Sequence, residues 1–442
     1  MPTLEIDSNK RYMMPNPVFV VSIDNKFLAI ARETGNWVLL ENDRQRLIYD
    51  ALSDGHSVVE LFDLFSSDDR NDIIKVLTEL EAKRFECTDI QYPQQHGIYI
   101  YLTNQCNQRC RHCYMYAGDE LDQELSTNEL QTILEKFSDS GGQVVTFTGG
   151  EATLRPDFAT IVQFAKKVGL QVCVLSNGLL WTDDLLNCVK TAIDEVQISI
   201  DGFDRESYKQ VRGTDSFDKA LSTVDNLVSA GIRTTVAVSP LLDTLLEHEH
   251  QYITFAKELS SKYSGKTFFV KFNTELMEGR NIVPTEQENQ QYRMASRRIK
   301  DACAPFAEEE GFAIDHVGNT VFHNCGYGGI TITANGDVYF CSIVSKCTKQ
   351  ANVRTESFES ILEKSKKAMA LSKISNLIPC SECPLKFLCG GGCRIKNFRK
   401  LVETFVGNQI EHTRFSRDIP CTQDQKEKFY RLMVKANSFF YR

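Results

Sequence analysis

The stretch GIYIYLTNQCNQRCRHCYMYAG, residues 97–118, indicates the fold of most of the 442-residue chain. It opens with β-branched and aromatic residues, which predict a strand, and continues into a polar loop that holds Cys106, Cys110 and Cys113. Similar β-rich runs follow, separated by helix-sized segments, the first of which begins at the capping box Ser126-Thr-Asn-Glu129. The six runs are GIYIYLT (97–103), VVTFT (144–148), QVCVLS (171–176), EVQISI (195–200), TTVAVS (234–239) and TFFVKF (267–272).

Six βα units in succession predict an α/β domain with a parallel sheet, because a crossover helix lets each strand run parallel to the one before it. We expect the six strands to form a partial (β/α)6 barrel, open on one side, over residues 93–300. In such folds the loops at the carboxyl ends of the strands carry the chemistry. The three-cysteine loop follows the first strand directly, so it is expected at that end.

The cysteine content of the chain points to metal. The chain has 15 cysteines, and neither a signal peptide nor a run of about 18 apolar residues is recognisable in it, so we expect a cytoplasmic protein. Disulfides are rare in the cytoplasm, which makes metal ligation the leading explanation. Three thiolates on one loop can hold three irons of a [4Fe–4S] cluster and leave the fourth iron open. Zinc is the alternative, but it requires a fourth protein ligand and is usually bound by paired C-x2-C knuckles.

The C-x3-C-x2-C spacing at the end of a first strand resembles the signature of the radical S-adenosylmethionine (SAM) superfamily. This resemblance implies that the open iron chelates the amino and carboxylate groups of the methionine part of SAM. The residues Gly149-Gly150-Glu151, after the second strand, resemble the family's motif for the amino group of SAM. Glycines let the backbone approach closely, and the carboxylate offsets the ammonium charge.

Further positions resemble SAM contacts of the same family. Arg212 resembles an arginine that pairs with the SAM carboxylate, with a surface salt bridge as its alternative role. His112 stands where the family usually has an aromatic residue near adenine, and an exposed loop histidine is the alternative. Residues at the ends of the third and fourth strands resemble positions that touch the ribose or methionine part of SAM: Ser176, Asn177, Ser199 and Asp201.

A second cysteine array follows residue 300, in a glycine-rich region with one clear hairpin signal, GITITANGDVYFC, that turns at Asn335-Gly336. The array resembles, cysteine for cysteine, the SPASM extension of radical SAM enzymes that act on peptides and proteins. The resemblance implies one auxiliary [4Fe–4S] cluster on Cys380, Cys383, Cys389 and Cys421, and another on Cys325, Cys341 and Cys393. The second set is one ligand short, and three alternatives stay open: Cys347, Cys303 or an open iron. We expect residues 301–442 to form a cysteine-rich SPASM domain organised around metal.

The amino-terminal region predicts a separate winged-helix-like domain over residues 1–92. The β-rich runs VFVVSI, KFLAIA and NWVLL are separated by turn signals at Asp24-Asn25 and Glu33-Thr34-Gly35, and three helical patterns follow up to Phe85. This arrangement resembles the PqqD-like peptide-recognition module of peptide maturases. The resemblance implies that a leader peptide adds as a strand beside residues 36–40, with the helix at about 70–83 as the other wall. A packing domain or a nucleic-acid-binding winged helix is the alternative, but the spread of basic residues among many acids speaks against nucleic acid.

These features together imply an enzyme with three [4Fe–4S] clusters and SAM that modifies a ribosomally made precursor peptide. The leading expectation is an intramolecular thioether, carbon–carbon or carbon–oxygen crosslink. A peptide epimerase and an enzyme similar to the anaerobic sulfatase maturases are the alternatives, with tetrapyrrole modification as a further one. A flavodoxin or ferredoxin is the expected electron donor. With a formal net charge of −9 and no basic stripe, we expect neither a nucleic acid nor a membrane as a partner.

Overall fold

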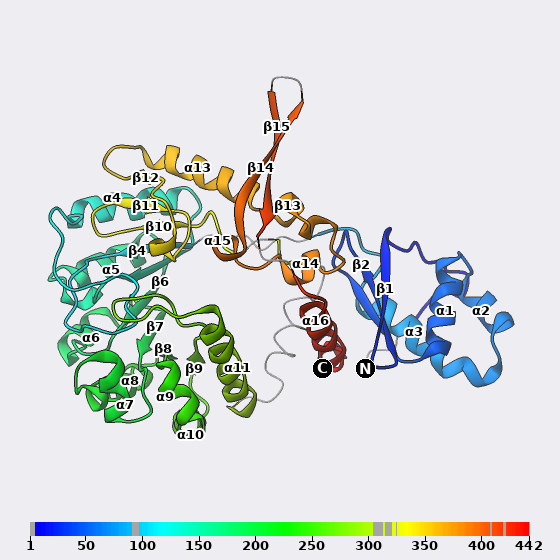
Figure 1. Ribbon diagram of the computed structural model, residues 1–442, viewed down its shortest axis with the longest axis horizontal. Helices are drawn as coiled ribbons and strands as arrows, with labels where there is room; N and C mark the ends of the chain where they lie inside the picture. The colour runs from blue at the N-terminus through cyan, green and yellow to red at the C-terminus, as the bar shows by residue number, and fades with distance from the viewer. Residues whose placement is uncertain are drawn as a thin grey trace. The chain divides into compact units, whose positions relative to one another are not determined.

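The computed structural model describes residues 5–90, 97–303, 313, 321–323, 325–406, 409–418 and 421–441. These residues divide into two compact units, and the chain passes between the units several times. The first unit contains residues 1–94, 306–327 and 369–442, and the second contains residues 95–305 and 328–368. Each unit is described separately below (Figure 1).

The second unit is built on a parallel sheet of six strands in chain order, as predicted (Figure 1). The register is continuous from strand to strand, with Ile98 opposite Val145 and Val196 opposite Thr234. The strands are β4 (Gly97–Tyr101), β5 (Val144–Thr148), β6 (Gln171–Ser176), β7 (Glu195–Ser199), β8 (Arg233–Val238) and β9 (Phe268–Phe272).

Helices connect these strands and bury their apolar faces against the sheet. Side chains alternate along each strand, so Val145 and Phe147 of β5 are buried beneath the helices whereas Val144, Thr146 and Thr148 are partly exposed. The helices are α4 (Thr127–Asp139), α5 (Phe158–Lys167), α6 (Asp183–Val189), α7 (Arg205–Arg212), α8 (Phe217–Ser229), α9 (Leu242–Glu247), α10 (Glu249–Lys262) and α11 (Glu286–Cys303), with short 3-10 turns η2 (Ala152–Leu154) and η4 (Val344–Lys346).

Three strands from the cysteine-rich region extend this sheet, which the sequence did not predict. The hairpin turns at Asn335-Gly336 as predicted, between β10 (Ile330–Ile332) and β11 (Asp337–Tyr339), and β12 (Ala351–Asn352) pairs with β11. β10 pairs parallel with β4, so the sheet has nine strands in the order β12-β11-β10-β4-β5-β6-β7-β8-β9. β10 has little apolar periodicity of its own, and only its position beside β4 identifies it as part of the sheet. Helix α13 (Phe358–Leu371) follows β12.

The first unit begins with the predicted three-stranded antiparallel sheet and three helices. The hairpin between β1 (Val18–Ile23) and β2 (Lys26–Ala31) turns at Asp24 and Asn25, which both have positive φ, as a two-residue type I′ turn requires. The other elements are β3 (Trp37–Leu40), α1 (Asp43–Ser53), α2 (Val58–Leu64), the 3-10 turn η1 (Ser67–Asp69) and α3 (Arg70–Ala82).

All four residues of β3 are buried, because the small sheet is covered on both faces. Val38 and Leu40 pack with the apolar faces of α1, α2 and α3. Trp37 and Leu39 point to the other face, where they pack with α16 (Gln423–Ala436), the amphipathic helix near the end of the chain. The expectation that residues after 300 are organised around metal is therefore incomplete, since α16 shares an apolar core with the amino-terminal sheet.

The remaining elements of the first unit surround its cysteines. A small core contains Ile374, Leu377, Phe387 and Phe398. β13 pairs parallel with β15, and β14 pairs antiparallel with β15 in a long hairpin (Figure 1). The elements are η5 (Ile374–Asn376), β13 (Leu377–Ile378), η6 (Cys380–Glu382), α14 (Lys386–Cys389), α15 (Arg394–Asn397), β14 (Phe398–Val406), β15 (Gln409–Arg417) and the final 3-10 turn η7 (Asn437–Tyr441).

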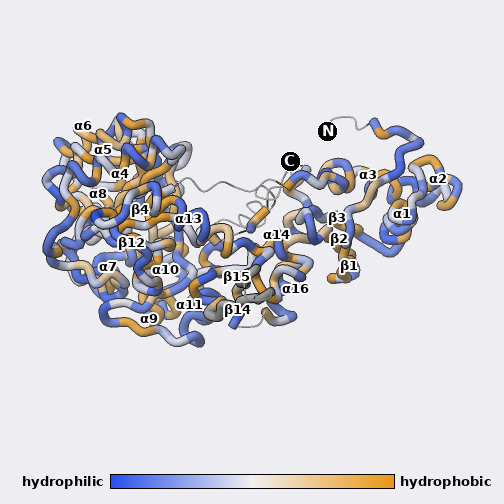
Figure 2. Tube along the Cα trace, turned by 90° about the horizontal axis from the view of Figure 1, so that it is seen from above, coloured by the Kyte–Doolittle hydropathy of each residue, from blue (hydrophilic) through white to orange (hydrophobic). Residues whose placement is uncertain are grey.

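Within the described part of the chain, no helix combines the length and the apolar character needed to cross a bilayer. Figure 2 shows hydrophobic and hydrophilic segments alternating along the coloured trace.

Candidate functional site

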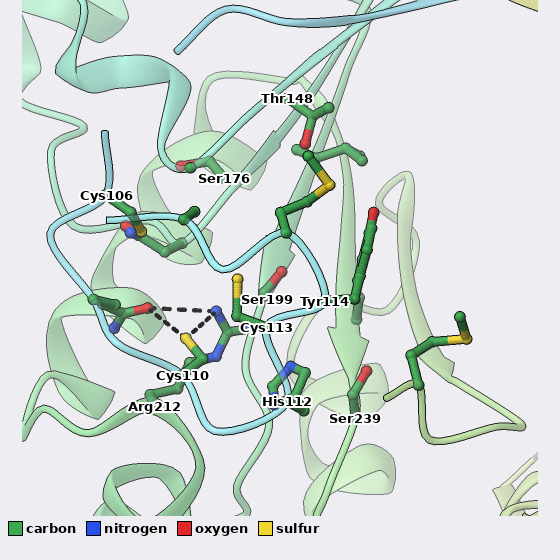
Figure 3. Close-up of a pocket in the computed structure, with 18 of the residues that line it drawn as sticks. Cys106, Cys110, His112, Cys113, Tyr114, Thr148, Ser176, Ser199, Arg212 and Ser239 are labelled. Atoms are coloured by element: carbon green, nitrogen blue, oxygen red, sulfur yellow. Dashed lines mark hydrogen bonds between the residues drawn. The ribbon is translucent and has the colours of Figure 1, made fainter. Parts of the chain in front are cut away.

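A cavity of about 300 Å³ opens at the carboxyl ends of the parallel strands of the second unit (Figure 3). Thr148, Ser176 and Ser199, at the last positions of β5, β6 and β7, line it, and so does Ser239 just beyond β8. The loop after β4 contributes the three cysteines of the predicted cluster motif, Cys106, Cys110 and Cys113. Figure 3 shows the labelled side chains of the loop and of the strand ends arranged around one space. The prediction that these parts of the sequence meet is confirmed.

Backbone contacts hold the cysteine loop against the sheet. Cys106 N donates to Gly118 O at 2.9 Å, which closes the loop on itself, and Arg111 N donates to Val211 O at 3.0 Å. Gly150 N donates to Thr103 O at 2.8 Å. A Cβ on Gly149 would lie 2.4 Å from Thr103 O, and one on Gly150 would lie 2.2 Å from Gln105 O. Both glycines are therefore needed for the close approach of the loops after β4 and β5.

The Glu151 carboxylate is fully buried and binds residues of the wall. Its Oε1 accepts hydrogen bonds from Ser176 Oγ at 2.8 Å and Thr153 Oγ1 at 2.6 Å, and its Oε2 accepts one from Asn177 N at 2.7 Å. Glu151 does not line the cavity, whereas its neighbours Gly149 and Gly150 and its partners Ser176 and Asn177 do. The carboxylate thus positions the loops after β5 and β6, while its predicted contact with SAM stays a prediction.

Asp201, Arg212 and His112 form a buried charged group beside Cys110. Arg212 Nε lies 2.6 Å from Asp201 Oδ2, and His112 Nε2 lies 3.4 Å from the same oxygen. Arg212 Nη1 also approaches Cys110 Sγ at 3.6 Å (Figure 3). Arg212 and His112 line the cavity, whereas Asp201 lies behind them and accepts a hydrogen bond from Ser239 N at 2.8 Å. A surface salt bridge does not hold as the alternative for Arg212, because this side chain is buried, and His112 is partly buried rather than exposed.

Burial dominates the pKa values in this group. It lowers the pKa of His112, against the opposing effect of Asp201, so the imidazole is neutral at neutral pH. Its Nδ1 is buried and has no hydrogen-bond partner among the residues described. Burial is also the largest single influence on Arg212 and opposes its charge, but Asp201, Cys110 and Tyr208 together outweigh burial and hold the pKa of Arg212 above its usual value. Burial also raises the pKa of the Cys106 thiol to about 11.

Gln108 is a buried member of the site that sequence reasoning missed. Its Nε2 donates to Tyr208 Oη and to Thr214 Oγ1, both at 3.0 Å, and its Oε1 lies 3.4 Å from Arg212 Nη1. It therefore links the cysteine loop to α7. The only sequence feature that could have indicated Gln108 is its place between Cys106 and Cys110, because an amide side chain in a polar loop carries no chemical signature.

The segment Glu278-Gly279-Arg280, after β9, fixes the third cysteine. Arg280 N donates to Cys113 O at 3.2 Å, and the Arg280 guanidinium donates to Ala117 O. A Cβ on Gly279 would lie 2.5 Å from the carbonyl carbon of His112. The segment thus shapes the cysteine loop.

The structure also brings together the four cysteines that were predicted to hold one auxiliary cluster. Burial raises the pKa values of Cys383 and Cys389, and the neighbouring thiols Cys380 and Cys421 raise them further. Arg417 Nη1 lies 3.9 Å from Cys380 Sγ. All of these residues belong to the first unit.

The other predicted auxiliary set is split between the units. In the first unit, Cys325 and Cys393 share a hydrogen bond, which lowers the pKa of Cys325 and raises that of Cys393, and Arg394 N donates to Cys325 Sγ at 3.4 Å. Cys341 and Cys347 belong to the second unit, where Cys341 lies close to Tyr114. Cys303 ends α11, with its Sγ 3.9 Å from Ile253 O. The choice among Cys347, Cys303 and an open iron stays a prediction.

The all-cysteine chemistry of these donor sets fits iron–sulfur clusters. In the part of the chain that is described, no group of three His, Cys, Asp or Glu side chains is close enough to share one ion. In a [4Fe–4S] cluster each thiolate binds a different iron, so its cysteines surround the cluster and need no common point of contact. Three thiols around one cavity and four neighbouring thiols meet that requirement.

Comparisons with known proteins agree with this chemistry. Residues 100–256 match the radical SAM superfamily, and residues 324–384 match the SPASM iron–sulfur cluster-binding domain. The chain is 27% identical, over 69% of its length, to 68% of the antilisterial bacteriocin subtilosin biosynthesis protein AlbA of Bacillus subtilis. It is 26% identical, over 67% of its length, to 82% of an AdoMet-dependent heme synthase of Oleidesulfovibrio alaskensis. A solved structure of anSMEcpe with bound AdoMet and Kp18Cys peptide shares the fold, with a TM-score of 0.56 and 17% identity over 77% of this chain and 99% of that one.

The fold and the cysteine-lined cavity thus define an iron–sulfur enzyme that uses SAM. The chain contains a radical SAM domain over residues 100–256 and a SPASM domain over residues 324–384. Its cofactors are accordingly SAM with a [4Fe–4S] cluster, and auxiliary clusters in the SPASM domain.

Proposed function

We propose that this enzyme crosslinks a ribosomally made precursor peptide through a thioether, carbon–carbon or carbon–oxygen bond. The observation that carries the proposal is that β3 is an edge strand of a small sheet flanked by α3. The same chain contains a cysteine-lined cavity to which we assign SAM. An edge strand is a template on which an extended peptide can add. The similarity to a bacteriocin biosynthesis protein supports the same substrate class.

We assign Cys106, Cys110 and Cys113 to the SAM-binding cluster, and we assign the SAM contacts to the residues predicted from the sequence that line the cavity. Gly149 and Gly150 let backbone groups reach the amino group of SAM, and Glu151 holds Ser176 and Asn177 in place for it. Arg212 places a positive charge beside the sulfur atom of Cys110. When bound, SAM and the clusters supply a 5′-deoxyadenosyl radical, which removes a hydrogen atom from an unactivated carbon, and a route for electrons.

The residues of the cavity wall would position the substrate carbon that loses its hydrogen atom. The wall includes the apolar residues Leu175, Ala237 and Leu276 and the polar residues Gln197, Ser239 and Asn273. The apolar groups exclude water from the reacting atoms, and the amides and the hydroxyl can orient a peptide backbone by hydrogen bonds.

We further propose the three domains predicted from the sequence: a peptide-recognition domain over 1–92, the barrel over 93–300 and the SPASM domain over 301–442. A leader bound to the first domain raises the effective concentration of the core peptide at the cavity. The free thiols and clusters require a reducing compartment, so we place the enzyme in the cytoplasm with a flavodoxin or ferredoxin as electron donor.

Anaerobic co-expression with the short open reading frame beside the gene tests the proposal. We expect the peptide to lose two hydrogen atoms per crosslink in cells with the wild-type enzyme and to keep its mass with a Cys106→Ala variant. An unchanged mass with deuterium gained from heavy water would establish the epimerase instead.

One comparison favours a second candidate, modification of a tetrapyrrole, because the chain is also similar to a heme synthase. The amino-terminal domain has no evident use for such a substrate. Conversion of an added iron porphyrin by the purified enzyme, with no change in any peptide, would replace the first proposal by this one.

A further inference from the structure

The outer edge of β3 is closed by a carboxylate. Successive residues of an antiparallel strand point their backbone groups alternately to the two sides. The Asn36 carbonyl and Ala31 N pair across β2 and β3, so Leu39, an odd number of residues further on, directs its N–H to the free side. There it donates to Glu79 Oε2 of α3 at 3.1 Å. Glu79 thus takes the place that a carbonyl of an added strand would take.

The same carboxylate binds the last turn of the chain. Glu79 Oε1 accepts hydrogen bonds from Asn437 Nδ2 at 3.0 Å and from the hydroxyl of Tyr441. Both residues belong to η7, which follows α16. Residues 437–441 therefore bind the carboxylate that lies beside the free edge of β3, and these contacts all lie within the first unit.

An aromatic pair and a lysine also hold the turn of residues 437–441 beside β3. The ring of Phe440 meets the ring of Trp37 edge-on, with the centroids 5.4 Å apart. Lys83 Nζ lies 3.7 Å from the Trp37 centroid and 4.9 Å from that of Phe440, and it pairs with Glu79 at 2.9 Å. Asn437 Oδ1 accepts a further hydrogen bond from Lys83. The turn therefore satisfies both members of an ion pair that is almost wholly buried.

This combination has the properties of an exchangeable ligand. The contact is made by a short 3-10 turn of five residues, and none of them is fully buried. The chemistry it uses, an aromatic ring on Trp37 and hydrogen-bond donors on Glu79, is available to any extended peptide with an aromatic side chain. A short turn without a fully buried residue can leave at a lower cost than the unfolding of a core element.

We propose that residues 437–441 are a built-in occupant of the peptide groove beside β3, and that the precursor peptide binds by displacing them. This inference rests on the proposed peptide substrate. Once displaced, the turn leaves Glu79 Oε1 and the ring of Trp37 to the incoming peptide, which must supply a hydrogen-bond donor and an aromatic side chain. The recognised class is accordingly an extended peptide segment with Phe or Tyr, and residues 437–441, Asn-Ser-Phe-Phe-Tyr, are its internal mimic.

The first test removes the occupant and returns it in trans. A chain that ends at Ala436 is mixed with a fluorescently labelled peptide of residues 434–442, VKANSFFYR, and the anisotropy is measured. We expect the peptide to bind the shortened chain at least about tenfold more tightly than the full-length chain, a factor equal to about 1.4 kcal/mol. The same peptide with Ala in place of Phe440 and Tyr441 is the matched control and is expected not to bind. Equal binding of VKANSFFYR to both chains, or to neither, would overturn the inference.

A second variant keeps the chain at full length in case the shortened one does not fold. Tyr441→Phe removes only the hydroxyl that binds Glu79, and we expect it to raise the affinity for the precursor peptide, because the competing turn is weakened. Lys435→Ala, on the adjacent helix, is the control and leaves the affinity unchanged. A lower affinity in Tyr441→Phe would mean that the turn is part of the binding wall, contrary to the inference.

Competition separates this inference from the proposed function. Unlabelled precursor peptide is expected to release VKANSFFYR from the shortened chain. Failure to release it, while the wild-type enzyme still changes the mass of the precursor, overturns the displacement and leaves the function standing. Absence of the mass change, with the tail peptide still bound, overturns the function and with it the identity of the displacing ligand.

Discussion

Glu151 shows how a residue recognised by a motif can act through its neighbours. A carboxylate in a glycine-glycine-glutamate sequence predicts a direct contact with an ammonium group, yet its oxygens already accept bonds from Thr153, Ser176 and Asn177. The motif identified an important residue, but only the structure shows which groups surround it.

Replacement of Glu151 by Gln is expected to loosen the strand end that it holds. The amide group of Gln has one acceptor oxygen and would turn an N–H toward the backbone N–H of either Asn177 or Thr153, leaving a buried donor unpaired at about 1–3 kcal/mol. Hydrogen exchange of the amides at residues 176–178 should accelerate by about 5- to 150-fold, and the affinity for SAM should fall. Glu135→Gln, the same change on the exposed face of α4, is the control. Unaltered exchange at residue 177 would show that Glu151 is not what holds this loop.

Gly279 offers a second test at the scale of one residue. A Cβ there would lie 2.5 Å from the carbonyl carbon of His112, so Gly279→Ala must move the loop that carries Cys110 and Cys113. We expect the variant to lose the cluster at this loop, about four irons per chain, and to keep the auxiliary irons. Iron and acid-labile sulfide per chain, measured after anaerobic purification, report the loss.

Gly97→Ala is the matched control for this change, because its nearest contact, Val144 O, is 3.8 Å away. It should retain all of the iron. A Gly279→Ala variant with full iron content would contradict the role assigned to this glycine.

At the scale of elements, the sequence predicted those strands and turns whose own residues carry a clear local pattern. The six parallel strands, the two-residue turn at Asp24-Asn25 and the hairpin at Asn335-Gly336 follow from alternation and turn chemistry, and all are confirmed. The pairing of β10 with β4 could not be predicted, because strands of three residues carry almost no periodicity. β14 and β15 were missed although the chain reads Gly407-Asn408 between them, a turn signal that the surrounding cysteine pattern obscured.

The ion pair between Glu129, in the first turn of helix α4, and Arg354 allows a prediction of how stability depends on pH. Glu129 closes the capping box with Ser126 and also binds Arg354, and the hydrogen bonds from Arg354 lower the pKa of Glu129 to about 2. A carboxyl whose pKa is depressed on folding stabilises the protein above its unfolded pKa of about 4.3, and this contribution is lost as the pH falls toward 2. Because Glu129 is partly exposed, we expect Glu129→Gln to cost at most about 1 kcal/mol at pH 7. The difference in unfolding free energy between the two proteins should shrink steadily below about pH 4.5.

Chemical denaturation of wild type, Glu129→Gln, Arg354→Gln and the double variant, at pH 7 and at pH 3.5, measures this contribution. Gln can still complete the capping box, so the cycle isolates the charge. A coupling that is the same at both pH values would contradict the assignment to the ion pair.

At the scale of the whole molecule, the two units depend on metal to different degrees. The second unit has a continuous apolar core that runs from Ile98 to Ile361 and includes all six parallel strands. In the first unit, the cysteine-bearing segment over residues 369–398 relies on a core of a few residues such as Ile374, Leu377 and Phe387. The amino-terminal sheet of that unit has its own cores on both faces.

Removal of iron should therefore loosen one part of the protein and spare the rest. A segment with a small core obtains much of its stability from metal binding, because the ligands are brought together only when the metal is bound. After treatment with chelator under reducing conditions, we expect limited proteolysis to cut within residues 369–398 and to leave residues 18–82 and 144–300 intact, with the fragments identified by mass spectrometry. Cys389→Ala, which removes one predicted ligand of the four-cysteine site, should reproduce the cuts around residues 380–393 without chelator. Cuts that begin in the parallel sheet instead would mean that the cluster of the SAM cavity, rather than the SPASM clusters, is what the fold most depends on.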